Sequence, residues 1–249
     1  MDYLFLPFRI IYKIYYLLFF SMAMLVTFPI YYYLLKNPKR YPTAFKMMRI
    51  HGYILVIFAG IILKVKGKKN IPEKGSFIIC TNHTSFMDAF CIYHLVSRYF
   101  TFVGKKEIEK WPLFHIFYTS GMNIMVDRSS VAGSFKSIKR MSQEIDMGNP
   151  LVIFPEGTRP KDPPNLGPFK PGAFAIAIQK QIPILPITFV DNWKRLGIGG
   201  MFKGKAGPGM GRVVIHQPVS TIGCKKNDID QLQEEVKKII AEPLSKTGE

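Results

Sequence analysis

A run of 22 residues without a charged side chain, from Ile14 to Leu35, constrains the fold of this chain more than any other feature. As an α-helix the run would be about 33 Å long, at roughly 1.5 Å per residue, which is enough to cross a bilayer. A second apolar stretch, from Gly52 to Leu63, is too short to span one. The chain is therefore expected to hold a membrane-associated apolar helical segment over residues 1–63 and a globular domain over residues 64–249.

Basic residues flank the uncharged run on both sides. A cleaved signal peptide is disfavoured because no small-residue cleavage site follows the run. A single transmembrane span would put one basic cluster on the wrong side of the membrane. A helical hairpin that dips into one leaflet keeps both clusters on the cytoplasmic face, and Pro29 is expected to interrupt a single helix. We favour this hairpin over a span and over a buried core helix. The clusters are Arg9 and Lys13 before the run, and Lys36, Lys39, Arg40, Lys46 and Arg49 after it.

The charge balance points to an anionic partner. The 34 Lys and Arg residues outnumber the 17 Asp and Glu residues, which gives a formal net charge of +17. The basic residues lie beside apolar runs and no nucleic-acid motif is recognised, so a membrane surface or a phosphorylated substrate is favoured over nucleic acid. A hydrophobic content of 48% excludes a disordered chain. Three dispersed cysteines, Cys80, Cys91 and Cys224, are typical of a reducing compartment.

After the apolar segment, short β-rich runs alternate with helical periods, which predicts an α/β fold with a mixed, largely parallel sheet flanked by helices. Lysines and glycines at residues 64–72 predict a linker. Strands are predicted at Ser76–Cys80, Phe100–Val103, Leu151–Phe154, Ile184–Val190 and Arg212–His216. Helices are predicted at Phe86–Ser97, Glu107–Phe117, Ser129–Met147 and Gly172–Lys180, and after a cap at Asn227 or Asp228, with Ile229, Leu232, Val236 and Ile239 on one face.

Two long loops, residues 155–171 and 192–211, are rich in Pro and Gly. Loops of this length in a compact domain are usually functional or mobile. The second loop carries four basic residues, so it is either a flexible solvated loop or a basic flap that touches lipid headgroups or a substrate.

The first candidate site follows the predicted strand Ser76–Cys80. His83 comes just after that strand, and Asp88 follows five positions later at the start of a predicted helix. The carboxylate can accept the Nδ1 hydrogen of the imidazole, which leaves Nε2 to take a proton from a substrate hydroxyl. Alternatively, Asp88 forms a capping box with Ser85 and His83 is an ordinary loop histidine. A metal site of His83, Asp88 and His94 is disfavoured, because no further Cys or carboxylate cluster completes it.

The second candidate site follows the predicted strand Leu151–Phe154. Gly157 permits a positive φ and close approach of the backbone to a ligand, and Arg159 offers a planar fork suited to phosphate. Thr158 offers a hydroxyl between them. Glu156 is expected to hold the loop by accepting hydrogen bonds from backbone N–H groups.

A third polar segment ends in Asp127 and Arg128. These two residues belong either to a site or to a surface ion pair, which would contribute under about 1 kcal/mol.

Four sequence blocks occur in a fixed order: Asn82-His83-Thr84-Ser85-Phe86-Met87-Asp88; Gly121 through Asp127-Arg128; Phe154-Pro155-Glu156-Gly157-Thr158-Arg159; and Ile182-Pro183-Ile184-Leu185-Pro186. Together they resemble the glycerolipid acyltransferase superfamily, above all the bacterial 1-acylglycerol-3-phosphate (lysophosphatidic acid) acyltransferases. The likeness runs from about Ile71 to Val190. The first and third blocks are its specific part, whereas the second and fourth are loose patterns.

The resemblance implies transfer of a fatty acyl group from an acyl thioester to the 2-hydroxyl of lysophosphatidic acid, which gives phosphatidic acid. His83, oriented by Asp88, would take the hydroxyl proton and return it to the leaving thiolate. Backbone N–H groups at the helix start after His83 are the candidate oxyanion donors. The further expected site residues are Arg159, Arg128 and Lys105 as phosphate contacts, Gly157 and Thr158 in the phosphate loop, and Asn82, Pro155 and Glu156 as shaping residues.

No metal or bound cofactor is implied, because the thioester of acyl-carrier protein or of coenzyme A is a co-substrate. The implied location is the cytoplasmic face of the cell inner membrane, where the lysophosphatidic acid substrate resides in the leaflet. Glycerol-3-phosphate or another lysolipid is an alternative acceptor. A noncatalytic protein that binds anionic membranes is the alternative from a different class.

Overall fold

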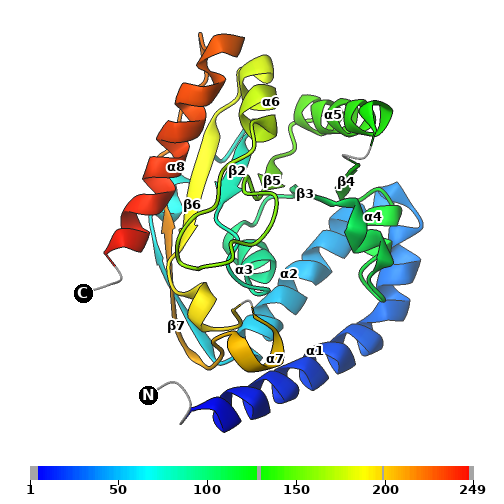
Figure 1. The fold of residues 1–249 in the computed structure, drawn as a ribbon. Helices are drawn as coiled ribbons and strands as arrows, with labels where there is room; N and C mark the ends of the chain where they lie inside the picture. Colours follow the sequence, from blue (N-terminus) through cyan, green and yellow to red (C-terminus); the bar gives the residue numbers. More distant parts are fainter. Residues whose placement is uncertain (1–4, 128–129, 198, 247–249) are drawn as a thin grey trace.

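A seven-stranded sheet forms the centre of the computed structural model, which describes residues 5–127, 130–197 and 199–246 (Figure 1). The strand order is β1-β7-β6-β2-β5-β3-β4. Neighbouring strands pair in parallel except β6 and β7, which are antiparallel. The predicted mixed, largely parallel sheet is confirmed. The strands are β1 (Ile61–Lys66), β2 (Ile78–Thr81), β3 (Thr101–Lys105), β4 (Ile124–Val126), β5 (Leu151–Ile153), β6 (Ile184–Phe189) and β7 (Gly209–Ile215).

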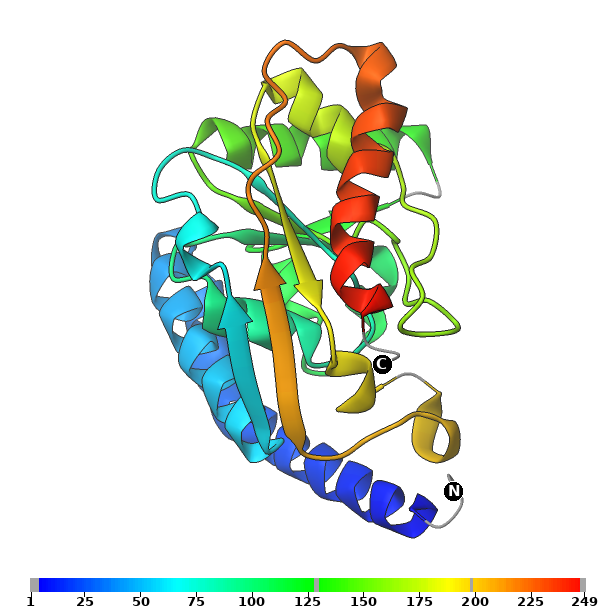
Figure 2. The same ribbon diagram turned by 90° about the vertical axis from the view of Figure 1, so that its left-hand side faces the viewer.

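Helices cover both faces of the sheet (Figures 1 and 2). Ile79 of β2 packs in one core with residues of α1, α2 and α3, whereas Ile78 and Cys80 pack in a second core with residues of α5, α6 and α8. All four β2 residues are buried, as expected for a central parallel strand covered on both faces. The helices are α1 (Leu6–Leu35), α2 (Tyr41–Phe58), α3 (Asp88–Leu95), α4 (Ile116–Thr119), α5 (Val131–Asp146), α6 (Gly172–Lys180), α7 (Gly200–Lys203) and α8 (Ile229–Ser245).

Helix α1 contains the whole uncharged run and continues through Pro29. The prediction that Pro29 interrupts the helix is therefore wrong. A proline removes one backbone hydrogen bond from a helix interior, but Met24 and Tyr31 on either side of it are buried in the core. Packing against the domain holds the helix together across the proline.

The N-terminal hairpin is formed by α1 and α2, which a short 3₁₀ turn at Pro38–Arg40 connects. Its turn follows the apolar run instead of dividing it, so Lys13 and Lys36 lie toward opposite ends of α1. Among the described helices, α1 is the one long and apolar enough to cross a membrane, by length and composition alone.

Helix α2 ties the hairpin to the rest of the fold. A Cβ added at Gly52 would lie 3.0 Å from the carbonyl oxygen of Phe90 and 3.2 Å from Cβ of Tyr93, both in α3. Only a residue without a side chain lets the two helices approach so closely.

The predicted boundary between residues 63 and 64 falls inside β1, which pairs with β7. The predicted linker at 64–72 is wrong at its start. Lys64 and Lys66 alternate with partly buried Leu63 and Val65, which is the pattern of a half-buried strand. The lysines therefore mark the solvent side of a strand.

Three other elements differ from the prediction. The expected helix Glu107–Phe117 is broken by Leu113, whose φ is +66°, into a 3₁₀ turn and α4. Strand β4 has three residues, too few to stand out as an apolar run. Helix α8 buries Leu232 and Val236 as predicted, but Ile240 is buried where Ile239 was expected.

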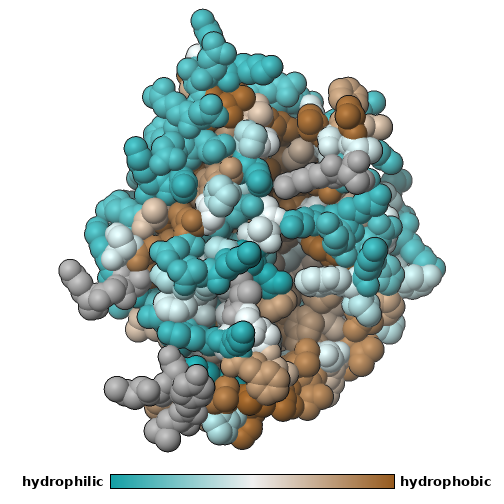
Figure 3. Space-filling model, in the orientation of Figure 1, coloured by the Kyte–Doolittle hydropathy of each residue, from teal (hydrophilic) through white to brown (hydrophobic). Residues whose placement is uncertain are grey.

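An apolar surface runs along α1 in the lower part of Figure 3, whereas the upper part of that view is mostly hydrophilic. Leu18 is 66% exposed and Val26 is 71% exposed. Soluble monomers rarely expose large apolar patches, so this surface supports membrane association. Its exposed large residues include Phe8, Ile11, Leu17, Leu18, Met22, Leu25, Val26 and Ile30 of α1 and Ile50, Ile54, Ile57 and Phe58 of α2.

Candidate functional site

The candidate site lies where three neighbouring strands end. Strands β2, β5 and β3 run in parallel, with Cys80 opposite Ile153 and Ile153 opposite Val103. Their carboxyl ends therefore lie at the same edge of the sheet, where open α/β sheets place their functional groups. The segments that follow them carry His83 and Glu156, and Lys105 is the last residue of β3.

His83 and Asp88 form a hydrogen-bonded pair. Nδ1 of His83 lies 3.1 Å from Oδ2 of Asp88, and the Asp88 side chain is fully buried whereas that of His83 is 25% exposed. Because a carboxylate only accepts, Nδ1 is the donor and Nε2 is left as the basic nitrogen of the ring. This arrangement suits abstraction of a proton from a bound hydroxyl.

The Asp88 carboxylate is held by three further donors. Oδ2 accepts the backbone N–H groups of Thr84 and Ser85, both at 2.8 Å, and Oδ1 accepts Nδ2 of Asn192 at 2.8 Å. These bonds compensate for the burial of a carboxylate. The bond from the Ser85 N–H is half of a capping box, so Asp88 serves the helix start and His83 together.

Two buried polar residues hold the backbone on either side of the pair. The Asn82 side chain donates to the Phe189 carbonyl at 2.9 Å and accepts the Phe189 N–H at 2.8 Å, as a paired strand residue would. Glu156 accepts the His83 N–H through Oε1 at 3.1 Å and the Gly167 N–H through Oε2 at 2.7 Å. Burial raises the pKa of Glu156, and the two backbone hydrogen bonds oppose that rise.

The His83 imidazole stacks on Phe154, with 4.1 Å between the ring centroids. Pro155, the next residue, is buried, and its carbonyl accepts the Lys170 N–H at 2.7 Å. The loop after β5 thus both supports the imidazole ring and returns to the start of α6.

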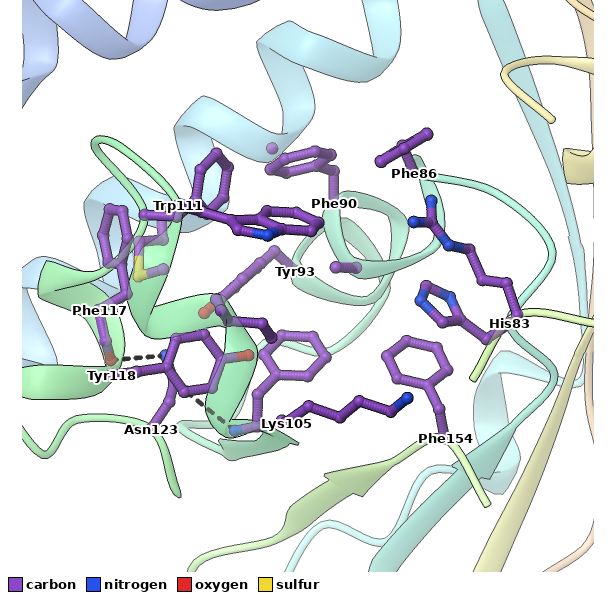
Figure 4. A pocket seen from close by; sticks show the side chains of 18 of the residues that line it. His83, Phe86, Phe90, Tyr93, Lys105, Trp111, Phe117, Tyr118, Asn123 and Phe154 are labelled. Carbon is purple, nitrogen blue, oxygen red and sulfur yellow. Dashed lines mark hydrogen bonds between the residues drawn. The ribbon is translucent and has the colours of Figure 1, made fainter. Parts of the chain in front are cut away.

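His83 lines a cavity of about 620 Å³. In Figure 4, His83 and Phe154 lie on one side of this cavity and Phe117 and Tyr118 on the other. The wall is largely apolar, and the inner face of α1 forms part of it. Its apolar lining residues include Leu17, Phe20, Met24, Phe86, Phe90, Phe102, Trp111, Phe114, Phe117 and Phe154.

Arg159 also lines the cavity, with its guanidinium carbon 3.9 Å from the centroid of the Phe86 ring. Burial lowers the pKa of Arg159, and the charge of Asp88 opposes this effect. Within the described part of the chain, the guanidinium forms no ion pair with a carboxylate. It is a partly buried cation available for an anionic ligand.

Other predicted phosphate residues lie around the same cavity. Gly157 has a φ of +68° in a turn closed by its N–H on the Phe154 carbonyl at 2.9 Å. Thr158 and Lys105 line the cavity, and the Lys105 side chain extends toward Phe154 in Figure 4. Arg128 lies outside the described residues.

The expected oxyanion donors are already occupied. The first two N–H groups after His83 donate to the aspartate, the Phe86 N–H donates to the Leu196 carbonyl at 3.4 Å, and the Met87 N–H donates to the Ser85 hydroxyl at 3.1 Å. The prediction of an oxyanion hole at this helix start is therefore wrong. These groups build the turn that positions the histidine.

Several residues at the site carried no signal in the sequence. Asn192 and Leu196 contact the first block from more than 100 residues away. Phe154 was predicted at the end of a strand and at the start of the third block, but not as the ring on which His83 stacks. No group of three or more metal-ligating side chains occurs in the ranges 5–127, 130–197 and 199–246.

The chain is similar to known proteins along most of its length. The family profile described as Acyltransferase matches residues 62–190. A chloroplastic 1-acyl-sn-glycerol-3-phosphate acyltransferase of Brassica napus is 30% identical over 204 residues, which cover 79% of this chain and 57% of that protein. A 1-acyl-sn-glycerol-3-phosphate acyltransferase of Helicobacter pylori is 34% identical over 131 residues, which cover 50% of this chain and 55% of that protein. The chain spans about half the length of these curated relatives.

A solved structure has the same fold. The crystal structure of the 1-acyl-sn-glycerophosphate (LPA) acyltransferase PlsC from Thermotoga maritima matches with a TM-score of 0.78 and 19% sequence identity. The match covers 97% of this chain and 98% of that chain. It includes the N-terminal hairpin as well as the sheet.

Proposed function

The chain belongs to the Acyltransferase family, and from this premise we propose that it transfers a fatty acyl group from an acyl thioester to the 2-hydroxyl of lysophosphatidic acid. The resemblance predicted from the four sequence blocks is thereby confirmed at the level of the family. The observation that carries the proposal is the His83–Asp88 pair on the wall of an apolar cavity that also holds the Arg159 guanidinium.

His83 acts as the general base in this proposal. Nε2 takes the proton of the 2-hydroxyl while Asp88 holds the imidazole through Nδ1. The substrate oxygen attacks the thioester carbonyl, the carbon–sulfur bond breaks, and His83 returns the proton to the leaving thiolate. General acid–base catalysis of this kind contributes about 10²- to 10⁴-fold in rate.

The phosphate of the acceptor would bind at Arg159. A guanidinium without a carboxylate partner binds phosphate through two parallel hydrogen bonds, and Gly157 lets the backbone of the loop approach the ligand. Lys105 and Thr158 would supply further contacts from the same cavity wall. Arg128 stays a sequence-based candidate for this phosphate.

The acyl chains would occupy the apolar cavity and the adjacent face of α1. The cavity volume of about 620 Å³ falls in the range of about 300–1,000 Å³ typical of ligand sites. The exposed apolar surface of α1 would place the site at the membrane, and the net charge of +17 favours an anionic leaflet. We assign this leaflet to the cytoplasmic face of the inner membrane, and the donor to an acyl-carrier protein or coenzyme A thioester.

The test is an acyl-transfer assay on the purified protein in vesicles that contain lysophosphatidic acid. Both thioester donors are supplied, and glycerol-3-phosphate and other lysolipids compete as acceptors. His83→Ala should lose at least about 10²-fold in kcat while it still binds the vesicles. His94→Ala is the matched control, because His94 lies on α3 and stacks on Tyr53 away from the cavity.

Each alternative has its own outcome in this assay. Preference for glycerol-3-phosphate or another lysolipid would overturn the assignment of lysophosphatidic acid as the acceptor. Retained transfer in His83→Ala would overturn general-base catalysis. Vesicle binding by the wild type without transfer to any acceptor would favour a noncatalytic membrane-binding protein.

A further inference from the structure

We propose that Asn192 is a positioning residue: its side-chain amide fixes the carboxylate of Asp88 and, through it, the imidazole of His83. This inference rests on the proposed acyl transfer. Asn192 belongs to the 3₁₀ turn after β6 and lies 104 residues from Asp88 in sequence. It does not line the cavity, so it would act on the reaction only through the pair.

The bonds to the Asp88 carboxylate are distributed unequally between its two oxygens. Oδ2 accepts three donors, from His83 and from the two N–H groups that follow it. Oδ1 accepts Nδ2 of Asn192 at 2.8 Å, and both side chains are fully buried. Among the described residues, this amide is the one hydrogen-bond donor to Oδ1.

The amide adds a second point of attachment that fixes the plane of the carboxylate, beside the two backbone N–H groups on Oδ2. The terminal torsion of an aspartate side chain is broad and has little preference of its own, so hydrogen bonds decide its angle. With Oδ1 bonded to Asn192, rotation that would take Oδ2 away from Nδ1 of His83 breaks a buried hydrogen bond. Without the amide, rotation of the carboxylate breaks no hydrogen bond at Oδ1, so the orientation of Asp88 is held less firmly.

The segment around Asn192 is anchored on both sides. The Asp191 carboxylate accepts the Arg212 backbone N–H at 3.1 Å and the Arg212 side chain at 2.7 and 2.8 Å, which ties the turn to β7. Burial raises the pKa of Asp191, but these bonds outweigh it and hold the pKa below its ordinary value. Beyond Asn192, the Leu196 carbonyl accepts the Ser85 hydroxyl at 2.9 Å. The anchored turn thus holds the Asn192 amide in place beside Asp88.

The test compares the wild type, Asn192→Ala and Asn149→Ala with lysophosphatidic acid and one acyl donor. A small misplacement of a catalytic group costs about 10²-fold, so kcat of Asn192→Ala should fall by about that factor while KM stays unchanged. Asn149→Ala is the matched control, because Asn149 donates Nδ2 to Glu144 at 2.7 Å away from the site. Its kcat should equal that of the wild type.

A second variant, Asn192→Asp, keeps the shape of the side chain and covers the case in which Asn192→Ala does not fold. It sets a carboxyl group against the Asp88 carboxylate, and only the protonated form can donate to Oδ1. Its kcat relative to the wild type should therefore recover as the pH falls. Charged or titratable groups near this pair include His83, Cys91, Glu156 and Arg159 and, beside Asn192 itself, Asp191 with Lys194 and Arg212. All are shared with the wild type.

A substrate-free readout separates this inference from the proposed reaction. The Nδ1 proton of His83, hydrogen-bonded to Asp88, should give a low-field proton NMR signal in the wild type and in Asn149→Ala. The signal should weaken or vanish in Asn192→Ala. If the wild type transfers no acyl group, the reaction is wrong and this signal alone decides the positioning role. An unchanged signal, or unchanged kcat in a folded Asn192→Ala, would overturn the inference.

Discussion

The backbone N–H of His83 donates to Oε1 of Glu156 at 3.1 Å, so the loop after β5 holds the residue that follows β2. Oε2 of the same carboxylate accepts the Gly167 N–H at 2.7 Å. One side chain therefore joins the imidazole-bearing turn, the loop with Arg159 and the segment that leads to α6. The first and third sequence blocks depend on each other through this residue.

We expect Glu156→Gln to lower activity although it changes the side chain little in size. Both carboxylate oxygens accept a backbone N–H, and in glutamine one of them becomes an amide that also donates. One buried N–H loses its acceptor, which costs about 1–3 kcal/mol. Unfolding in denaturant measures the loss of stability, and kcat at pH 7 measures the loss of activity. Glu235→Gln, at an exposed position of α8, is the control, and equal behaviour of the two variants would contradict the bridging role.

Arg159→Ala should raise the KM for lysophosphatidic acid by about 10- to 100-fold, because a charge-assisted hydrogen bond contributes about 1.5–3 kcal/mol. The KM of Arg159→Lys should lie between those of the wild type and Arg159→Ala, since an ammonium keeps the charge but not the planar fork. Steady-state kinetics at several lipid concentrations measure KM. Arg98→Ala is the matched control, because Arg98 also lies over a phenylalanine ring, that of Phe77, but donates to backbone carbonyls. An unchanged KM in Arg159→Ala would move the phosphate site elsewhere.

The sequence predicts which segments contribute to the site, but it predicts side-chain pairings only within one short segment. His83 and Asp88 are five residues apart across a single strand-to-helix turn, so their pairing follows from local structure. The contact of Asn192 with Asp88 depends on the position of β6 beside β2, and no local pattern encodes that neighbour. The oxyanion prediction failed mainly for a local reason, because the Thr84 and Ser85 N–H groups donate to the Asp88 carboxylate of the same segment. The distant Leu196 carbonyl accepts the Phe86 N–H.

The fold shows the same difference between features with a local sequence pattern and features that depend on distant contacts. Central strands such as β2 and β6 are buried on both faces and appear in the sequence as continuous apolar runs. Strand β1 is half-buried and carries lysines on its outer side, which made it look like a linker. Pro29 was judged by local preference, whereas the packing of Tyr31 against the domain determines that α1 continues.

Gly104→Ala should narrow the end of the cavity that Tyr118 lines. A Cβ at this position of β3 would lie 2.7 Å from the Tyr118 ring, so the ring has to move. Under the proposed function, long acyl chains should then react more slowly relative to short ones. A donor series of increasing chain length measures this ratio. Gly172→Ala is the control, because its added Cβ would meet nothing within 4 Å, and a ratio unchanged in Gly104→Ala would exclude acyl chains from this end of the cavity.

Leu18→Asp and Val26→Asp should each weaken binding to vesicles of phosphatidylcholine and phosphatidylglycerol by roughly tenfold or more. Both side chains lie on the exposed apolar surface of α1, and burial of such a side chain contributes about 1.5–3 kcal/mol. Co-sedimentation with the vesicles measures the binding. Ile222→Asp replaces a still more exposed apolar residue outside the hairpin and should bind as the wild type does. Equal loss in all three variants would mean that α1 is not the membrane contact.

Acid should destabilise the protein below about pH 6.5 through neutral histidines that are at least partly buried, of which the partly buried His216 is the clearest test. The Thr188 hydroxyl donates to the Ile240 carbonyl at 3.0 Å, so it accepts Nε2–H of His216 at 2.9 Å. Burial lowers the pKa of His216, and the unfolded chain therefore binds more protons between the folded and unfolded pKa values. The free energy of unfolding falls as the pH drops through that interval. Denaturant unfolding at pH 7, 6 and 5 should show a smaller fall for His216→Gln, which does not titrate, and identical pH dependence in both proteins would contradict this account.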